Sequence, residues 1–439
     1  MISTIINMFK IKELRQRLLF TVGLLAIYRI GCYVPAPGIN PDMLSRFFGS
    51  GSGDLLNLMD LFTGGAMRQL TIFALGVMPY ISASIIIQLM TSVVPALERL
   101  SREGEAGRRK INQYTRYGTI LVCVIQAAML SKALLSSEVN MIPAPYFNII
   151  LIITLTAGTT FLMWLGEQIT SRGIGNGISL IITAGIVSKM PVAGRMMWNL
   201  YIMGGDESRP MYQAIILLIM FVAVVAGVIF VVQGQRRIPV QYAKRAVAGG
   251  RMMQGHSTYI PLRVNQAGVI PIIFASAVLM IPAAIGKIIP DRFEMLQNFF
   301  SMFSYGNGVY ILANAVAIIF FCYFYTAITF NPVQIADDFK KGGAFIPGVR
   351  PGQATSEFLE RVMVRITLPG SLFLAFIACV PMVISAWLSV PPLIASFLGG
   401  TGLLIVVGVM LDTMQQVEAH LLMRHYDGFM NKGRLRGRY

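Results

Sequence analysis

The sequence contains little charge for its length. Charged residues make up 13% of its 439 residues, and 55% are hydrophobic. A soluble domain carries charge on roughly 25% of its residues. This composition argues against a soluble multidomain enzyme and predicts an integral membrane protein.

Residues that usually carry catalysis are also scarce, since the chain has four cysteines and three histidines. The cysteines are far apart without a CxxC pair, no HExxH occurs, and the histidines lie outside the apolar runs. The glycine-rich stretch "RGIGNG" (172–177) follows no strand and lacks the GKS or GKT of a phosphate loop, so it predicts a tight turn. We therefore expect no enzyme activity, no metal and no cofactor.

Negative charge is scarcer than positive charge, and the net charge is +16. Of the 36 Lys and Arg residues, 27 lie in the N-terminus and in every second loop after it, against eight in the opposite loops. In membrane proteins, Lys and Arg favour cytoplasmic loops. The pattern predicts that both termini are cytoplasmic. Binding to a nucleic acid such as ribosomal RNA is an alternative explanation of the positive charge.

Long apolar runs are abundant, and a membrane-spanning helix needs about 20 such residues. Their length and aliphatic content favour helices over barrel strands. Ten spans are predicted, at about 18–34, 71–92, 114–134, 147–168, 177–197, 211–232, 267–289, 308–330, 366–387 and 393–413. The fold class is therefore an all-α integral membrane protein.

A short polar linker at about 200–210 has five predicted spans on each side. Proline occurs in the second span, at Pro79, and in the seventh, at Pro271 and Pro282. Pro79 is expected to bend its helix. The pattern predicts two halves of opposite orientation, an arrangement that commonly places a pathway between the halves. The halves are 1–205 and 206–439.

The C-terminal half contains two long basic loops, 233–266 and 331–365, and ends in a basic tail. Loops of this length usually carry function, so we expect them to dock an acidic surface. A solvated topology anchor is the alternative. Acidic residues near a bilayer centre are missing from the sequence. This argues against a transporter coupled to protons or sodium, although that class and an intramembrane enzyme remain alternatives.

Two apolar features suggest a constriction in the membrane. Val77, Ile81 and Ile85 recur at a spacing of four, as do Ile178 and Ile182, which places each set on one helical stripe. Such stripes usually face lipid or the core, but they can also line a pore that closes by dewetting. The segment 54–65 is apolar but too short to span. It is either an interfacial helix or a short helix that folds back into a cavity.

Four long motifs closely resemble the bacterial SecY family, whose members are the channel subunits of the protein-export translocon. They are "FALGVMPYISASIIIQLM", "EGEAGRRKINQYTRYGT", "MWLGEQITSRGIGNGISLII" and "GAFIPGVRPGQAT". The resemblance covers nearly the whole chain. It implies ten helices in two inverted-repeat halves of five around a central pore, with a short plug helix at about 54–64.

The resemblance also assigns roles to individual residues. The implied pore ring is Val77, Ile81, Ile178, Ile182, Ile273 and Ile405. The implied plug includes Asp54, Leu55, Leu58, Met59, Phe62 and Gly64. The implied lateral gate between spans two and seven includes Ser82, Gln126 and Asn265. The implied docking residues are Arg236, Arg237, Lys244, Arg251 and Arg350.

Two positions depart from the family pattern. Val77 stands where isoleucine is common, which implies a slightly wider ring. The stretch "AGGRMM" leaves Arg251 alone where some relatives carry paired arginines, which puts the ribosome contact there in doubt.

The implied function is a passive channel in the cytoplasmic (inner) membrane, driven by a partner. It would move unfolded, signal-sequence-bearing polypeptides across the membrane and release apolar segments sideways into lipid. The implied partners are the SecE and SecG subunits, the SecA motor ATPase and the ribosome.

Overall fold

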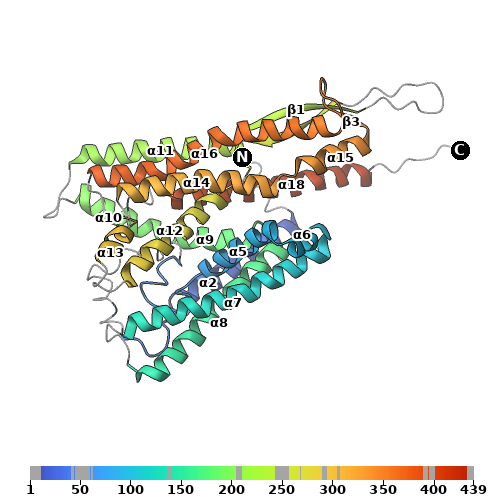
Figure 1. Cartoon of the computed structure of the whole chain (residues 1–439). Helices are drawn as coiled ribbons and strands as arrows, with labels where there is room; N and C mark the ends of the chain where they lie inside the picture. The colour runs from blue at the N-terminus through green and yellow to red at the C-terminus, as the bar shows by residue number, and fades with distance from the viewer. Residues whose placement is uncertain are drawn as a thin grey trace, which may run out of the picture. The chain divides into compact units, whose positions relative to one another are not determined.

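A computed structural model gives the arrangement of the helices and strands (Figure 1). It describes residues 11–40, 44, 60, 63–135, 141–203, 210–242, 257–266, 268–288, 294–303, 307–388, 394 and 401–432. The helices of the first 203 residues are α2 (Lys12–Gly31), α5 (Met78–Val93), α6 (Pro95–Arg102), α7 (Glu105–Leu135), α8 (Ala144–Arg172), α9 (Gly177–Val187) and α10 (Met190–Tyr201).

The rest of the chain adds further helices and a small sheet. The helices are α11 (Met211–Gln233), α12 (Ile270–Ile288), α13 (Glu294–Ser301), α14 (Gly308–Thr329), α15 (Pro332–Gly342), α16 (Gln353–Leu388) and α18 (Thr401–Lys432). The strands are β1 (Gln235–Tyr242), β2 (Ser257–Arg263) and β3 (Ala344–Phe345).

The helical membrane class is confirmed. Each of the ten predicted spans overlaps a helix of the structure. Among the described residues, six helices are long and apolar enough to cross a membrane, and a seventh is added if the bent pair α5–α6 counts as one span. The count of ten spans therefore stays a prediction.

The second predicted span differs from expectation at its start. Its helix begins at Met78 rather than at 71, and the preceding residues form turns. Pro79 lies in the first helical turn and does not bend the helix from within. A proline in the first turn sacrifices no intrahelical hydrogen bond, because the N–H at that position has no partner in any helix. Pro282, by contrast, does lie inside α12.

The predicted turn at 172–177 is confirmed as the link between α8 and α9. The Asn176 side chain accepts hydrogen bonds from the backbone N–H groups of Ile178 (3.1 Å) and Ser179 (3.3 Å), which caps α9. A Cβ on Gly177 would lie 2.0 Å from the carbonyl oxygen of Gly166. Glycine is therefore required where α9 crosses α8.

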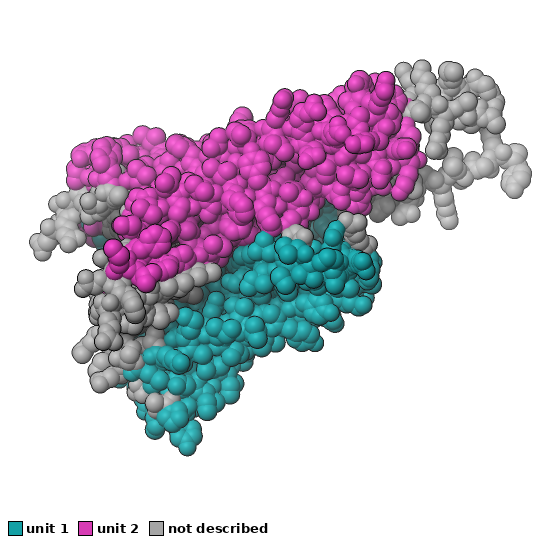
Figure 2. All heavy atoms as spheres, in the orientation of Figure 1, with its two compact units in different colours: residues 1–199, 405–439 teal, residues 200–404 magenta. Residues whose placement is uncertain are grey.

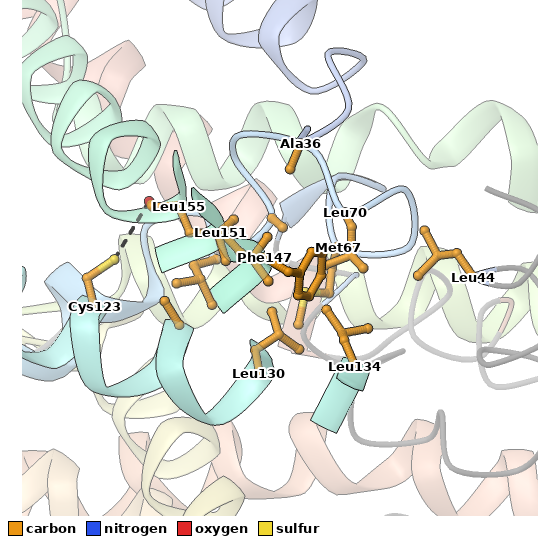
Figure 3. Close-up of a cluster of buried hydrophobic side chains, with 13 residues drawn as sticks. Ala36, Leu44, Met67, Leu70, Cys123, Leu130, Leu134, Phe147, Leu151 and Leu155 are labelled. Carbon is orange, nitrogen blue, oxygen red and sulfur yellow. Dashed lines mark hydrogen bonds between the residues drawn. The ribbon is translucent and has the colours of Figure 1, made fainter. Parts of the chain in front are cut away.

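A leucine-rich core joins α7, α8 and the turns before α5 (Figure 3). Its buried members are Ala36, Leu44, Met67, Leu70, Ala74, Leu75, Cys123, Ala127, Leu130, Leu134, Phe147, Leu151 and Leu155. The Cys123 thiol also donates to the Leu155 carbonyl at 3.7 Å. This core holds the irregular 66–75 segment in place, so the chain reaches α5 from a fixed direction.

The sheet was not predicted from the sequence. β1 pairs antiparallel with β2 and, on its other edge, with β3. Ile238 and Val240 point inward and are 4% and 1% exposed, while their neighbours are exposed. With Leu262, Leu359 and other apolar residues they form a core that includes α16.

The chain divides into two compact units, coloured separately in Figure 2. Unit 1 contains residues 1–199 and 405–439, and unit 2 contains 200–404. The first boundary lies close to the linker of the predicted division at 205. The end of the chain belongs to unit 1 because α18 packs there: Gly175 N–H donates to Gln416 Oε1 at 3.0 Å, and Val417 packs with Leu14 and Ile174.

Candidate functional site

The six residues of the implied ring are distributed over both units. Val77 caps α5, Ile81 lies in α5, Ile178 and Ile182 lie in α9, and Ile405 lies in α18, all in unit 1, whereas Ile273 lies in α12 of unit 2. Five are between 0% and 7% exposed, and Ile178 is half-buried. Ile178 also contacts α8, since its Cγ1 lies 2.7 Å from where a Gly166 Cβ would sit. The ring itself stays a prediction.

The implied plug falls mostly outside the described residues. Asp54, Leu55, Leu58, Met59 and Phe62 are not described, whereas Asp60 and Gly64 at its C-terminal end are.

The C-terminal end of the implied plug, at Thr63 and Gly64, is anchored to α2. The Arg29 Nη1 group donates to the Gly64 carbonyl at 2.8 Å, and the Tyr28 hydroxyl donates to the Thr63 carbonyl at 3.3 Å. Gly64 has a φ of +67° and is buried, and a Cβ there would lie 2.8 Å from the Cα of Gly185 in α9. This backbone therefore packs directly on α9.

An ion pair completes the same cluster. The Lys189 Nζ group, between α9 and α10, is in direct contact with Asp60 Oδ2, and the two side chains are only 11% and 7% exposed. We call the group Tyr28, Arg29, Asp60, Gly64 and Lys189 the plug seat. Sequence analysis assigned no partner to Lys189, which lies within the predicted span 177–197. The one available signal was a lone lysine after a long apolar run.

The implied gate residues lie in different local settings. Ser82 is half-buried on α5, which packs against α7. Gln126 lies on α7, and its buried Oε1 has no hydrogen-bond partner among the described residues. Asn265 is not on a helix but in the turn between β2 and α12, where its Nδ2 donates to the Gly268 carbonyl at 3.0 Å. Its local role is to close that turn.

The implied docking arginines are exposed where they are described. Arg236 and Arg237 lie on β1, and the Arg237 guanidinium stacks 4.9 Å from the Tyr259 ring centroid. Arg350 follows β3, and its carbonyl accepts from Thr355 Oγ1 at 2.8 Å. Lys244 and Arg251 lie outside the described residues.

The pairing of β1 with β3 connects the two long basic loops. Gln241 pairs with Phe345, and Tyr242 with Ala344. Arg236 and Arg237 lie on β1 of this sheet, which we call the arginine-bearing sheet, and Arg350 lies in the segment that follows β3. Loop length and charge alone did not indicate that the loops fold together.

A second ion pair joins α7 to α8. Arg116 donates two hydrogen bonds of 2.7 Å to the Glu167 carboxylate, from Nε to Oε1 and from Nη2 to Oε2. The two side chains are 48% and 32% exposed. The two parallel hydrogen bonds fix the register of α7 against α8. This pair is accessible to water.

The described residues contain no group of three or more His, Cys, Asp or Glu side chains that could hold a metal ion.

Comparison with known proteins gives a consistent result over nearly the whole chain. The family model described as SecY matches residues 71–414. The SecY subunit of the protein translocase of Haemophilus influenzae is 44% identical, with 97% of this chain and 96% of that protein covered. The corresponding subunit of Escherichia coli is 43% identical, with the same coverage.

Solved structures support the same fold at lower sequence identity. A protein-conducting channel superimposes with a TM-score of 0.65 at 18% identity, covering 96% of this chain and 94% of that one. A second structure, Sec61 in a canine ribosome–channel complex, has a TM-score of 0.61 at 18% identity, with the same coverage.

Proposed function

The chain belongs to the SecY family, and on that premise we propose that it is a protein-conducting channel of the bacterial cytoplasmic membrane. The observation that carries the proposal is sequence identity of 43–44% to SecY translocase subunits over at least 97% of the chain. The channel would move unfolded, signal-sequence-bearing polypeptides. It would catalyse no reaction, so the energy would come from a partner.

The proposed barrier is the aliphatic ring. Its six members are valine and isoleucine, whose side chains offer water and ions no hydrogen-bonding group. A narrow apolar constriction closes by dewetting and needs no specific ligand. It also accepts passing side chains of different sizes, as an unfolded substrate requires. The burial of Ile81 and Ile182 supports positions that face protein rather than lipid.

The proposed plug, residues 54–64, would reinforce the ring when no substrate is present. Support comes from its C-terminal end, because a segment held by Arg29 and Tyr28 of α2 can act as a fixed base about which the rest moves. A structural relative at 18% identity has a plug that stabilises the closed state of its channel.

Sideways release into lipid would occur between α5 and α12, with α7 and α14 beside them. Each Leu or Ile of a span contributes several tenths of a kcal/mol to partitioning into the bilayer. The packing of α5 on α7, and of α12 on α14, supports gate edges that move as helix pairs. A cysteine pair bridging α5 and α12 is expected to stop export when oxidised. Undiminished export would argue against a moving gate.

The proposed partners bind on the cytoplasmic side, where both termini would lie. Exposed Arg236, Arg237 and Arg350 support docking of an acidic surface on the SecA motor or of ribosomal RNA. SecE and SecG would complete the membrane complex.

Reconstitution tests the function directly. The purified chain with its small membrane partners, placed in vesicles with the motor ATPase and ATP, should carry an unfolded secretory protein into a protease-protected space. Vesicles without the chain are the control. A lack of protection in complete vesicles would contradict the proposal, whereas uptake of a small solute would support a transporter.

A further inference from the structure

The connection between α12 and α14 contains a short apolar helix that the proposed channel does not use. This helix, α13 (Glu294–Ser301), has eight residues. At 1.5 Å per residue it is about 12 Å long, less than half of the roughly 30 Å of a bilayer's hydrocarbon core. It therefore cannot cross the membrane. The stretch 295–303 reads "MLQNFFSMF" and contains no charged residue.

The apolar side chains of α13 are exposed on one side. Met295 and Phe299 are 90% and 55% exposed, and Leu296 and Met302 are exposed beside them. The spacing of four and then three residues between Met295, Phe299 and Met302 places them on one helical face. The polar Gln297 belongs to the opposite side and is half-buried. This is the reverse of a water-facing surface helix, whose apolar side packs inward and whose polar side is exposed.

The other side of α13 is anchored within unit 2. The helix contacts α12, and Phe303 packs with Tyr310 of α14 and Met382 of α16. The Phe299 ring lies edge-on to the rings of Phe300 and Phe303, with centroids 5.5 Å and 5.8 Å away. The exposed apolar face is therefore held in a fixed position by the ends of neighbouring helices.

Within unit 2, α13 lies at the end opposite to the arginine-bearing sheet (Figure 1). α14 begins shortly after α13, and its far end leads through α15 to β3. The segment that contains α14 is long and apolar enough to cross a membrane. A membrane crossed by α14 therefore has the sheet on one side and α13 at the other surface.

An exposed apolar stripe on α14 leads toward α13. Val309, Leu312, Val316 and Phe320 are all exposed, and their spacing of three or four residues places them on one face. On a membrane-spanning helix such a face meets the acyl chains of the bilayer. The stripe begins at Val309, next in sequence to the Tyr310 that packs with the end of α13. The apolar surface that starts within the bilayer on α14 thus continues onto α13.

We propose that α13 is an interfacial helix whose exposed apolar face inserts among phospholipid acyl chains, in the leaflet opposite to the arginine-bearing sheet. Helices of this kind lie in the plane of the membrane with the apolar face buried about 5–10 Å deep. Insertion holds the adjoining ends of α12 and α14 at the membrane surface and so sets the depth of both helices. The inference goes beyond the channel function and requires only that the chain is a membrane protein. A second protein, or a second copy of this chain, covering the same face is the competing explanation.

The first experiment measures the depth of a fluorescent probe in the full-length chain, reconstituted in vesicles of phosphatidylcholine and phosphatidylglycerol. The four native cysteines are replaced by alanine, and Phe299→Cys is labelled with an environment-sensitive dye. The quenchers are lipids that carry a nitroxide near the headgroup or near the chain end, and iodide in the water. We expect the shallow nitroxide to quench the probe most. Iodide should quench it severalfold less than a probe at Arg237→Cys on β1.

Further probe positions calibrate the depth. Val316→Cys, near the middle of α14, should be quenched most by the deep nitroxide, and Gln297→Cys should meet less lipid than Phe299→Cys. Iodide quenching at position 299 as strong as at position 237 would overturn the proposal. Protection from both kinds of quencher would also overturn it, because a protein would then cover the helix. No translocation is measured, so failure here would leave the proposed function untouched.

The second experiment tests whether the apolar face is what holds α13 in lipid. Met295→Glu with Leu296→Glu places two carboxylates on that face, and carboxylates are unfavourable among acyl chains. A probe at Met302→Cys should then be quenched severalfold more by iodide and less by the shallow nitroxide. The matched control, Met295→Leu with Leu296→Met, keeps the face apolar and should change neither value. Both side chains are exposed, so both variants should fold, which thermal unfolding verifies. Equal quenching in the two variants would overturn the proposal.

Discussion

The plug seat and the arginine-bearing sheet place the same kinds of charged residue in opposite surroundings. In the plug seat, Lys189 is buried and its charge is matched by one carboxylate. By contrast, Arg236 on the sheet and Arg350 in the segment after β3 are both exposed. The first region therefore depends on the exclusion of water and the second on display of charge to a partner. The role of a positively charged residue in this chain therefore depends on whether it is buried or exposed.

The comparison also separates two kinds of failure. Substitutions near the plug seat should give a channel that folds poorly or conducts ions at rest. Substitutions on the sheet or in the segment after β3 should give a channel that is folded and closed but does not support export. The following substitutions test that separation, beginning with the largest effect.

Gly177→Ala should have the largest effect because it disrupts the close contact between α8 and α9. The added Cβ would lie 2.0 Å from the Gly166 carbonyl oxygen. Because that oxygen belongs to the backbone of α8, the clash cannot be relieved by rotation of a side chain. Overpacking of this kind costs about 1–3 kcal/mol or more. We expect a lower unfolding temperature and reduced protein in the membrane. Gly194→Ala, with no atom within 4 Å of the new Cβ, is the matched control and should be tolerated.

Ile81→Asn combined with Ile182→Asn should give a folded but leaky channel. Both side chains are buried, at 7% and 2% exposure, and an amide at each position attracts water into a constriction that closes by staying dry. Resting ion conductance should rise severalfold, as measured in bilayers. Ile120→Asn on α7, where the side chain is 37% exposed, is the control. Unchanged conductance in the double variant would remove the ring from the proposal.

Arg350→Glu should stop export while the channel stays folded and closed. The side chain is exposed, and reversal of its charge replaces attraction with repulsion toward an acidic partner. Pulse-labelled secretory protein should accumulate uncleaved in cells, with protein level and resting conductance at the wild-type value. Lys341→Glu, also exposed in the same loop, controls for charge change alone. Normal export in the Arg350 variant would contradict the docking role.

The contrast between regions also explains what could be predicted from the sequence. The apolar runs fixed the helical class, because a bilayer demands long uncharged helices, and the glycines and asparagine of 173–177 fixed the α8–α9 turn. Long motifs identified the family. These signals are local in the chain, so no knowledge of the packing was needed.

What the sequence missed depends on contacts between distant segments. The β1–β3 pairing joins residues about a hundred positions apart, and the Asp60–Lys189 pair spans 129. Pro79 was misjudged for a related reason: whether a proline bends a helix or begins one depends on where the preceding residues are held, and here the 66–75 turns are held by the leucine-rich core. Burial, which distinguishes the paired Lys189 from an exposed topology signal, is likewise set by packing.

Arg116→Gln should have the smallest effect and so sharpens the comparison of the two ion pairs. The Arg116–Glu167 pair is well formed, yet its side chains are 48% and 32% exposed, so water and salt screen each charge and can solvate the one left behind. The expected loss is about 1 kcal/mol or less at low salt. It should shrink further in high salt, as followed by thermal unfolding in detergent.

At the plug seat, removal of one partner should cost more than this, because the charge that is left behind is largely buried. The loss at the plug seat should also be nearly independent of salt, since buried pairs are screened much less than exposed ones. Equal losses in Arg116→Gln and Lys189→Met, with equal salt dependence, would show that burial does not separate the two pairs.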